Sequence, residues 1–271
     1  MRLLSAPHPT ALAAARVWRL PLVAWLAATL IAWTETNQGL FQLVNGLAAH
    51  LSPCFWQWVT VSGDTLLAFA ILLPLIRRRP ELAGAVLVTV LLAMLLVHGI
   101  KPWAAMPRPP AVLAPEQLHI IGKDLRSGSF PSGHSATAFA LAALLGSWLA
   151  PGWPRRLLLA LAVLVGLSRM AVGVHWPQDV LVGASIGWLS GLAGIDLARR
   201  WEGLRGRGVW LFTQGLLLLG AAWIFIDFQS GYPDARRWEL AVGFAGIVLF
   251  FRPQGSGVRN QESERMDRGP A

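Results

Sequence analysis

The stretch that decides the fold is LAGAVLVTVLLAMLLVHGIKPWAAMPRPP, residues 82–110, in which an uncharged apolar run gives way to a basic, proline-rich segment. From residue 82 to residue 100 the chain has no Asp, Glu, Lys or Arg, and this run approaches the ~20 residues that a helix needs to cross a bilayer. The run ends at Lys101, and Arg108 follows in a segment interrupted by prolines. This pattern predicts a membrane-spanning helix that ends in a basic loop.

The composition of the whole chain supports a membrane environment. Of 271 residues, 55% are hydrophobic and 14% are charged, whereas soluble domains have about 25% charged residues. Fourteen Trp against one Tyr suit a protein with many membrane–water boundaries, where indole rings anchor. The single Cys54 rules out an intramolecular disulfide and a Cys-based metal site. These features exclude an ordinary soluble domain.

Eight apolar segments predict an all-α integral membrane protein with a six-helix core and two further C-terminal transmembrane helices. The segments are 18–34, 58–76, 82–100, 134–150, 155–172, 178–198, 209–226 and 239–251. The first resembles a signal peptide but lacks a small-x-small cleavage pattern after it, so we expect a retained helix. A mixed stretch from Gln38 to His50 predicts an interfacial helix.

Basic residues between the apolar segments predict the topology. Alternate connections hold most of them: Arg2/Arg16/Arg19, Arg77–Arg79, Arg155/Arg156, Arg199/Arg200/Arg205/Arg207, and the tail. The net charge of +9 is therefore a topology signal, and no nucleic-acid partner is expected. The positive-inside rule places these connections and both termini in the cytoplasm. The remaining connections face outward.

One outward loop breaks this rule and predicts an anion site. Residues 101–133 carry Lys101, Arg108, Lys123 and Arg126, and Arg169 ends the fifth segment. Basic residues on the side that the rule depletes need another reason, and binding an anion is the simplest. Three of them, Lys101, Arg108 and Arg169, are expected to hold the equatorial oxygens of a phosphoryl group, where charge spreads in the transition state.

Two short strings on the same side predict the catalytic groups. Ser132 and Gly133 stand where the fourth segment begins, and a helix N-terminus with a Ser cap is a ready phosphate cradle. His175 and Asp179 are spaced i and i+4, with a proline between them suited to the first helical turn. That spacing lets the carboxylate fix the imidazole tautomer and leave the other ring nitrogen as a nucleophile. His134 is a second imidazole, available as an acid to the leaving oxygen.

Together these strings resemble the three-part signature of the type 2 phosphatidic acid phosphatase superfamily. The matching patterns are Lys-x6-Arg-Pro, Pro-Ser-Gly-His and Ser-Arg-x5-His-x3-Asp. The matching residues are Lys101, Arg108, Pro109, Pro131, Ser132, Gly133, His134, Ser168, Arg169, His175 and Asp179.

The resemblance implies a bacterial membrane enzyme that hydrolyses a lipid phosphate or diphosphate without a metal or cofactor. His175 would form a phosphohistidine with Asp179 orienting it, and His134 would protonate the leaving group and then activate water. The family acts on undecaprenyl diphosphate, phosphatidylglycerophosphate, phosphatidate and lipid A, and the signature does not choose among them. The site would face the periplasm from the inner membrane. A phosphotransferase using the same residues and an anion transporter remain as alternatives.

The resemblance also divides the chain. Residues 1–200 would form the phosphatase core, 201–251 the two additional transmembrane helices, and 252–271 a disordered cytoplasmic tail.

Asp64, an intramembrane carboxylate at the start of the second segment, is expected to cap or pair locally. The outward loop with Asp227, Asp234, Arg236 and Arg237 could reach a headgroup, but the sequence does not assign it to the site.

Overall fold

Every apolar segment predicted from the sequence is helical in the computed structural model, which describes residues 18–253. The helices are α1 (Arg19–Trp33), α2 (Asn37–Ala48), α3 (Pro53–Val61), α4 (Thr65–Arg78), α5 (Ala83–Ala104), α6 (Pro109–Val112), α7 (Gly133–Trp148), α8 (Trp153–Ala171), α9 (Pro177–Arg200), α10 (Arg207–Ile226) and α11 (Arg236–Phe251). Short 3₁₀ turns occur at η2 (Pro80–Leu82), η3 (Pro115–Gln117), η4 (Glu202–Arg205) and η5 (Pro233–Ala235). Among the described residues no segment forms a β-strand, so the all-α prediction is confirmed.

The number of membrane spans is smaller by strict length and hydropathy than the sequence suggested. Within residues 18–253, three helical segments are long and apolar enough to cross a bilayer: Pro80–Val112, Pro177–Arg200 and Arg207–Ile226. A fourth span forms if α3 and α4 count as one. The expectation of six spans plus two therefore remains a prediction, although the helices themselves are present.

The segment 58–76 is not the continuous helix that its hydropathy predicted. It divides into α3 and α4, which meet at an angle of 55°. The break falls at Ser62-Gly63-Asp64, and the Asp64 carboxylate caps α4 by accepting a hydrogen bond from the Leu66 N–H at 2.8 Å. Local capping of Asp64 is confirmed. Gly63 fits here because a Cβ would press on the backbone of His134 and the side chain of Val165.

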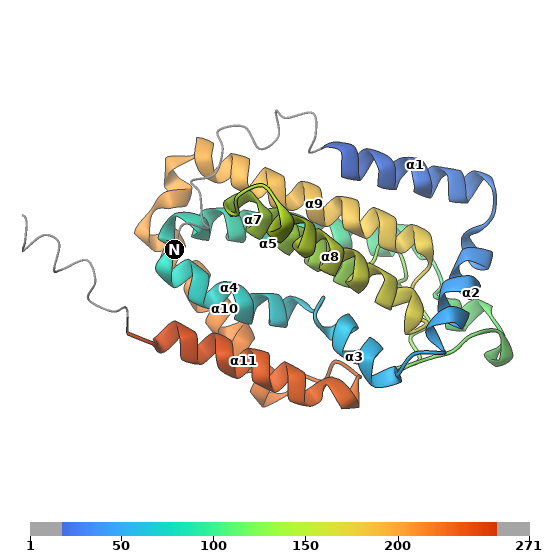
Figure 1. Cartoon of the computed structure of the whole chain (residues 1–271). Coiled ribbons are helices and arrows are strands. Elements are labelled where there is room, and N and C mark those ends of the chain that lie inside the picture. Colours follow the sequence, from blue (N-terminus) through green and yellow to red (C-terminus); the bar gives the residue numbers. More distant parts are fainter. Residues whose placement is uncertain (1–17, 254–271) are drawn as a thin grey trace, which may run out of the picture.

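Helix α9 is the centre of the bundle, packed against α7, α5 and α1 (Figure 1). Glycines at every third or fourth position make this approach possible. A Cβ at Gly183 would overlap the carbonyl of Ser132, and one at Gly187 would overlap the carbonyl of Ala136. Small residues at such crossings let helix backbones touch, as is common in membrane bundles. The glycines thereby hold the start of α7 against α9.

The last two helices form a hairpin that packs against α4. We call α10, the loop 227–235 and α11 the C-terminal hairpin. Its loop contacts α3 through η5, at the same end of the bundle as α2 and the long connection before α7 (Figure 1). The predicted tail, 252–271, lies outside the described residues except for 252 and 253.

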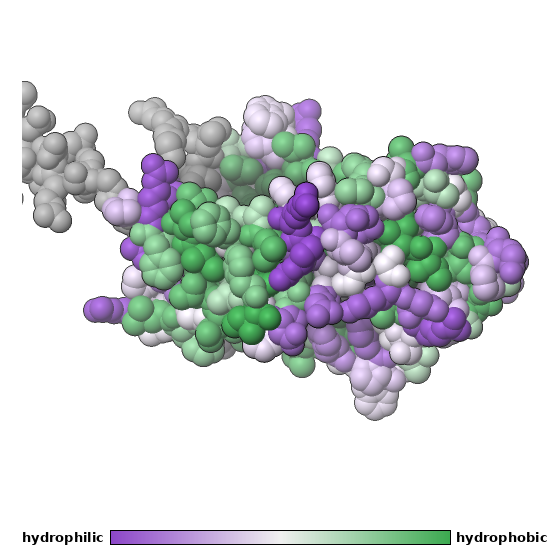
Figure 2. All heavy atoms as spheres, turned by 90° about the horizontal axis from the view of Figure 1, so that it is seen from below, coloured by the Kyte–Doolittle hydropathy of each residue, from purple (hydrophilic) through white to green (hydrophobic). Residues whose placement is uncertain are grey.

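The surface agrees with a bilayer environment. Leu26 on α1, Leu95 on α5 and Leu219 on α10 are 70%, 70% and 71% exposed, far more than leucines in a soluble core. Figure 2 shows hydrophobic side chains over one part of the bundle. Hydrophilic side chains gather towards the right of the view, the end that holds α2 and the long connection before α7 in Figure 1. Exposed apolar surface of this extent identifies an integral membrane protein.

Candidate active site

The centre of the site is a buried histidine–carboxylate pair at the start of α9. Nδ1 of His175 lies 3.2 Å from Oδ2 of Asp179. The two residues are one helical turn apart, and Pro177 begins the helix between them as predicted. His175 is 2% exposed and Asp179 is fully buried. The carboxylate therefore accepts a hydrogen bond from Nδ1–H, and the lone pair of the ring lies on Nε2.

The same carboxylate oxygen is fixed by two further donors. The Ser129 hydroxyl and the Trp176 N–H, the latter at 2.9 Å, both donate to Oδ2 of Asp179. The N–H of Ser132 donates to the Asp179 carbonyl at 3.0 Å. These bonds tie the start of α9 to the start of α7. Ser129 was missed by the sequence analysis because nothing in its local spacing indicates a partner fifty residues away.

Two of the predicted basic residues, Arg108 and Lys101, lie side by side near Nε2 of His175. Nη1 of Arg108 is 3.4 Å from Nε2 of His175 and donates to the Val174 carbonyl at 3.1 Å. Nη2 of Arg108 donates to the Gly128 carbonyl at 3.2 Å, and Nζ of Lys101 donates to the same oxygen at 2.6 Å. The shared carbonyl brings both cations together although they are separated along the chain.

Arg169, the third predicted phosphate ligand, is buried beside this group at 3% exposure. Its carbonyl accepts a hydrogen bond from the N–H of His175 at 3.2 Å, which links the end of α8 to the loop that carries His175. Its Nη1 donates to the hydroxyls of Thr60 and Tyr232. Among the described residues its Nε has no hydrogen-bond partner. A buried guanidinium with a free donor is suited to an anion.

The start of α7 supplies a helix N-terminus, as the sequence predicted. Ser132 is the cap, and its side chain accepts from the N–H of Ser135 at 3.4 Å. Gly133 and His134 lie in the first turn, where an α-helix leaves its N–H groups without internal partners. His134 is partly buried and interacts electrostatically with Arg169 and His175.

The electrostatic setting favours the neutral form of His175. Burial, together with the positive charges of Arg108, Arg169 and Lys101, holds the pKa of His175 well below its ordinary value. The imidazole therefore stays uncharged near neutral pH. An uncharged ring whose Nδ1–H donates a hydrogen bond to Asp179 carries its lone pair on Nε2, which faces Arg108.

Two other basic residues of the long loop do not join the site. Arg126 pairs with Asp124 at 2.7 Å on the surface, and Nζ of Lys123 donates to the Gln229 carbonyl at 3.3 Å. The expectation that all the basic residues of this loop serve an anion is therefore wrong for these two. Both side chains find partners on exposed loops instead.

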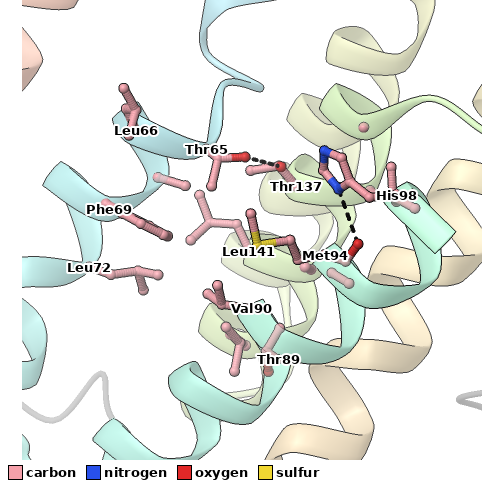
Figure 3. Close-up of a pocket in the computed structure, with 17 residues that line it drawn as sticks. Thr65, Leu66, Phe69, Leu72, Thr89, Val90, Met94, His98, Thr137 and Leu141 are labelled. Atoms are coloured by element: carbon pink, nitrogen blue, oxygen red, sulfur yellow. Dashed lines mark hydrogen bonds between the residues drawn. The ribbon is translucent and has the colours of Figure 1, made fainter. Parts of the chain in front are cut away.

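An apolar cavity of about 360 Å³ begins next to the phosphate cradle. It lies between α4, α5 and α7, with Gly133, His98 and Thr137 among its lining residues (Figure 3). The rest of its wall is almost wholly hydrocarbon, apart from groups such as Thr65, whose hydroxyl bonds that of Thr137 at 3.1 Å. Such a cavity suits an alkyl or prenyl chain.

A helical membrane protein with a buried histidine–aspartate pair facing several basic side chains falls in the class of phosphoryl-transfer enzymes. The comparison with protein families agrees. Residues 82–202 match the PAP2 superfamily, and the chain belongs to this family. It is a hydrolase of the lipid phosphatase type, as its relatives are.

The chain matches two curated relatives and one solved structure over most of the length of each. The chain is 30% identical over 160 residues to the undecaprenyl-diphosphatase of Sulfolobus acidocaldarius, covering 58% of this chain and 72% of that one. It is 26% identical over 239 residues to phosphatidylglycerophosphatase B of Escherichia coli, covering 70% and 89%. The crystal structure of Aquifex aeolicus LpxE matches with a TM-score of 0.50 and 30% identity, over 59% of this chain and 94% of that one.

Proposed function

We propose that this chain hydrolyses a lipid phosphate or diphosphate through a phosphohistidine on His175. The observation that carries the proposal is the orientation of one imidazole. Asp179 binds its Nδ1 at 3.2 Å while Nε2 points towards Arg108 at 3.4 Å. A phosphoryl group held by the arginine therefore meets the lone pair of Nε2. Such proximity between nucleophile and bound electrophile supplies a large part of the rate.

The first step forms a P–N bond and breaks a P–O bond. Nε2 of His175 attacks phosphorus, and the leaving lipid oxygen takes a proton from His134. In the second step water attacks phosphorus, His134 accepts its proton, and the P–N bond breaks to release inorganic phosphate. Lys101, Arg108, Arg169 and the start of α7 at Ser132 and Gly133 stabilise the charge on the equatorial oxygens.

A metal has no assigned part in this scheme. Within residues 18–253 no group of three or more His, Cys, Asp or Glu side chains could hold a metal ion. The positive charge that a magnesium ion supplies in other phosphoryl transfers comes here from Lys and Arg side chains. Turnover that persists in excess chelator is the expected result.

The cavity beside Gly133 supports a lipid substrate. Gly133, at the start of α7, lines the cavity, so a chain lying in it keeps the attached phosphate near the first turn of α7. An anion transporter would need polar groups along a path through the membrane, whereas this cavity is apolar. A phosphotransferase would use the same residues and differ only in passing the phosphate to an acceptor other than water.

We further propose that residues 1–200 form the catalytic core of an inner-membrane protein, with the site on the periplasmic side and both termini in the cytoplasm. The ends of the helices support this arrangement. Helix α8 has Arg155 and Arg156 in its first turn and Arg169 in its last turn, while α9 begins at the site and ends in Arg199 and Arg200. The basic connections and the site therefore lie at opposite ends of the bundle, as the positive-inside rule requires.

Phosphate release from purified protein across a panel of lipids tests the function. The panel holds undecaprenyl diphosphate, phosphatidylglycerophosphate, phosphatidate and lipid A, each in mixed micelles. Rapid quenching in alkali should trap phosphate on the protein with the acid lability of a phosphohistidine. Release without any trapped intermediate in the wild type and in slow variants would contradict the covalent route. Transfer to an added alcohol in preference to water would identify a phosphotransferase.

A further inference from the structure

The C-terminal hairpin reaches into the site from outside the region that defines the family. The family match ends at residue 202, before α10 begins at Arg207. Tyr232, in the loop of this hairpin, is nevertheless 6% exposed, and its Oη accepts a hydrogen bond from Nη1 of Arg169 at 3.2 Å. A residue contributed by an addition to the core thus touches a side chain of the phosphate site.

Tyr232 and Thr60 hold the same nitrogen of the guanidinium. Nη1 of Arg169 donates to the Thr60 hydroxyl on α3 and to the Tyr232 hydroxyl, and Thr60 is fully buried. With one nitrogen bound twice, the plane of the guanidinium is fixed. The opposite edge, which includes the unpartnered Nε, is then available to a ligand. Arginine binds phosphate best through two parallel N–H groups, so this orientation matters.

The loop that carries Tyr232 is itself anchored on both sides. Nε2 of Gln57 donates to the Asp234 carboxylate at 2.8 Å, and the Asp234 N–H donates back to the Gln57 side chain at 2.9 Å. The indole of Trp58 donates to the Asp234 carbonyl at 2.9 Å. On the other side, Gly122 packs so closely on the loop that a Cβ there would overlap Tyr232. Tyr232 is therefore presented to Arg169 from a rigid position.

We infer that Tyr232 is a positioning residue for Arg169. Through this residue, the C-terminal hairpin contributes to phosphate binding at the site. The inference rests on the proposed phosphatase function. A pre-oriented guanidinium binds the phosphoryl group without first losing side-chain freedom, which strengthens binding of the transition state. The hydroxyl acts through Arg169 and takes no part in bond making or breaking.

The test is Tyr232→Phe, which removes one oxygen and keeps the ring. We expect inhibition by vanadate, a mimic of the pentacoordinate phosphoryl group, to weaken about tenfold, the size associated with losing a hydrogen bond to a charged group. kcat/KM for the lipid phosphate should fall by a similar factor. The matched control is Trp238→Phe, which removes another hydrogen bond of the same hairpin, from the indole to the Ser62 hydroxyl at 3.2 Å.

A spectroscopic readout separates positioning from general stability. Tyr232 is the single tyrosine of the chain, so protein labelled with 3-fluorotyrosine gives one fluorine resonance. Saturating vanadate should shift this resonance, and the melting temperatures of Tyr232→Phe and Trp238→Phe should agree. Unchanged vanadate inhibition in Tyr232→Phe, with an active wild type, would overturn the inference and leave the proposed function intact. A wild type that neither releases phosphate nor binds vanadate would overturn both.

Discussion

The start of α9 and the C-terminal hairpin both supply contacts to the site, but they do so in different ways. At the start of α9 the partners His175 and Asp179 are four residues apart, so a single helical turn sets their geometry. In the hairpin, Tyr232 meets Arg169 across 63 residues, and tertiary contacts bring them together: α10 and α11 pack on α4, and the loop between them is held by α3. Local spacing therefore specifies the chemistry, whereas tertiary packing refines it.

The largest effect should come from the residue at the centre of the first region. His175→Ala removes the nucleophile, so we expect the rate of phosphate release to fall by at least about 10⁴-fold for every lipid in the panel. Rapid-quench trapping should find no phosphate on this variant. His50→Ala, at an exposed position, is the control and should keep full activity. Phosphate trapped on His175→Ala but not on His134→Ala would exchange the two roles.

Asp179→Asn should rank next. The amide keeps the size of the side chain but presents a weaker acceptor to Nδ1 and perturbs the bonds from Ser129 and Trp176. A loss of about 10² to 10⁴ in kcat is expected, as for other orienting carboxylates. Single-turnover rates on a lipid phosphate measure it. A variant as fast as the wild type would show that the pair is structural, and the first region would then need no orienting carboxylate.

A steric change of the same kind in each region sharpens the comparison. Gly187→Ala presses on the Ala136 carbonyl behind the site, and Gly246→Ala presses on the Ala70 carbonyl where α11 meets α4. Overpacking costs roughly 1–3 kcal/mol, so both variants should melt earlier in detergent. Only Gly187→Ala should also weaken vanadate inhibition, since it displaces α7 from α9.

Gly146→Ala on α7 is the control for these two variants. Nothing lies within 4 Å of a Cβ at this position, so its melting temperature should match or exceed that of the wild type. If Gly246→Ala weakened vanadate inhibition as strongly as Gly187→Ala, the hairpin would be as closely coupled to the cradle as α9 is.

The smallest effect should appear in the pH profile. Because the pKa of His175 is lowered, protonation of this ring should begin to limit activity only at pH values well below the ordinary histidine pKa of about 6.5. Arg108→Gln removes a positive charge that disfavours the protonated ring, so the pKa of His175 rises and the acid limb moves to higher pH. Profiles of kcat/KM measure the shift. Arg126→Gln, whose guanidinium pairs with Asp124 on the surface, should leave the limb in place.

Sequence reasoning predicted the elements that depend on local rules. The eight apolar segments, the Ser132 cap, the helix start at Pro177 and the His175–Asp179 contact all follow from hydropathy, capping and i,i+4 spacing. The capping of α4 by Asp64 is a further feature that local rules predicted. The excess of basic residues in an outward loop predicted Arg108 and Lys101, which the structure places together on one carbonyl.

The remaining features depend on contacts between distant parts of the chain. The break at Ser62-Gly63-Asp64 was missed because apolar residues continue on both sides, although Gly next to a capping Asp is a turn signal. Ser129, Thr60 and Tyr232 were missed because a lone hydroxyl has no pattern. Asn45 was also missed, although its amide clamps the end of α8 through the carbonyls of residues 170 and 171 at 3.0 and 3.1 Å.

Helix α8 carries basic residues at both ends, Arg155 near its start and Arg169 near its finish, and this has a consequence for how catalysis scales. Its 19 residues extend about 28 Å, close to the thickness of the hydrocarbon layer. If the chain acts on a lipid phosphate as proposed, the reacting phosphate lies at headgroup depth, at the Arg169 end of α8, while its hydrocarbon lies in the apolar cavity between α4, α5 and α7. Encounter is then two-dimensional: the rate follows the mole fraction of phosphorylated lipid in the leaflet, and inert lipid acts as a diluent even when the bulk concentration is unchanged.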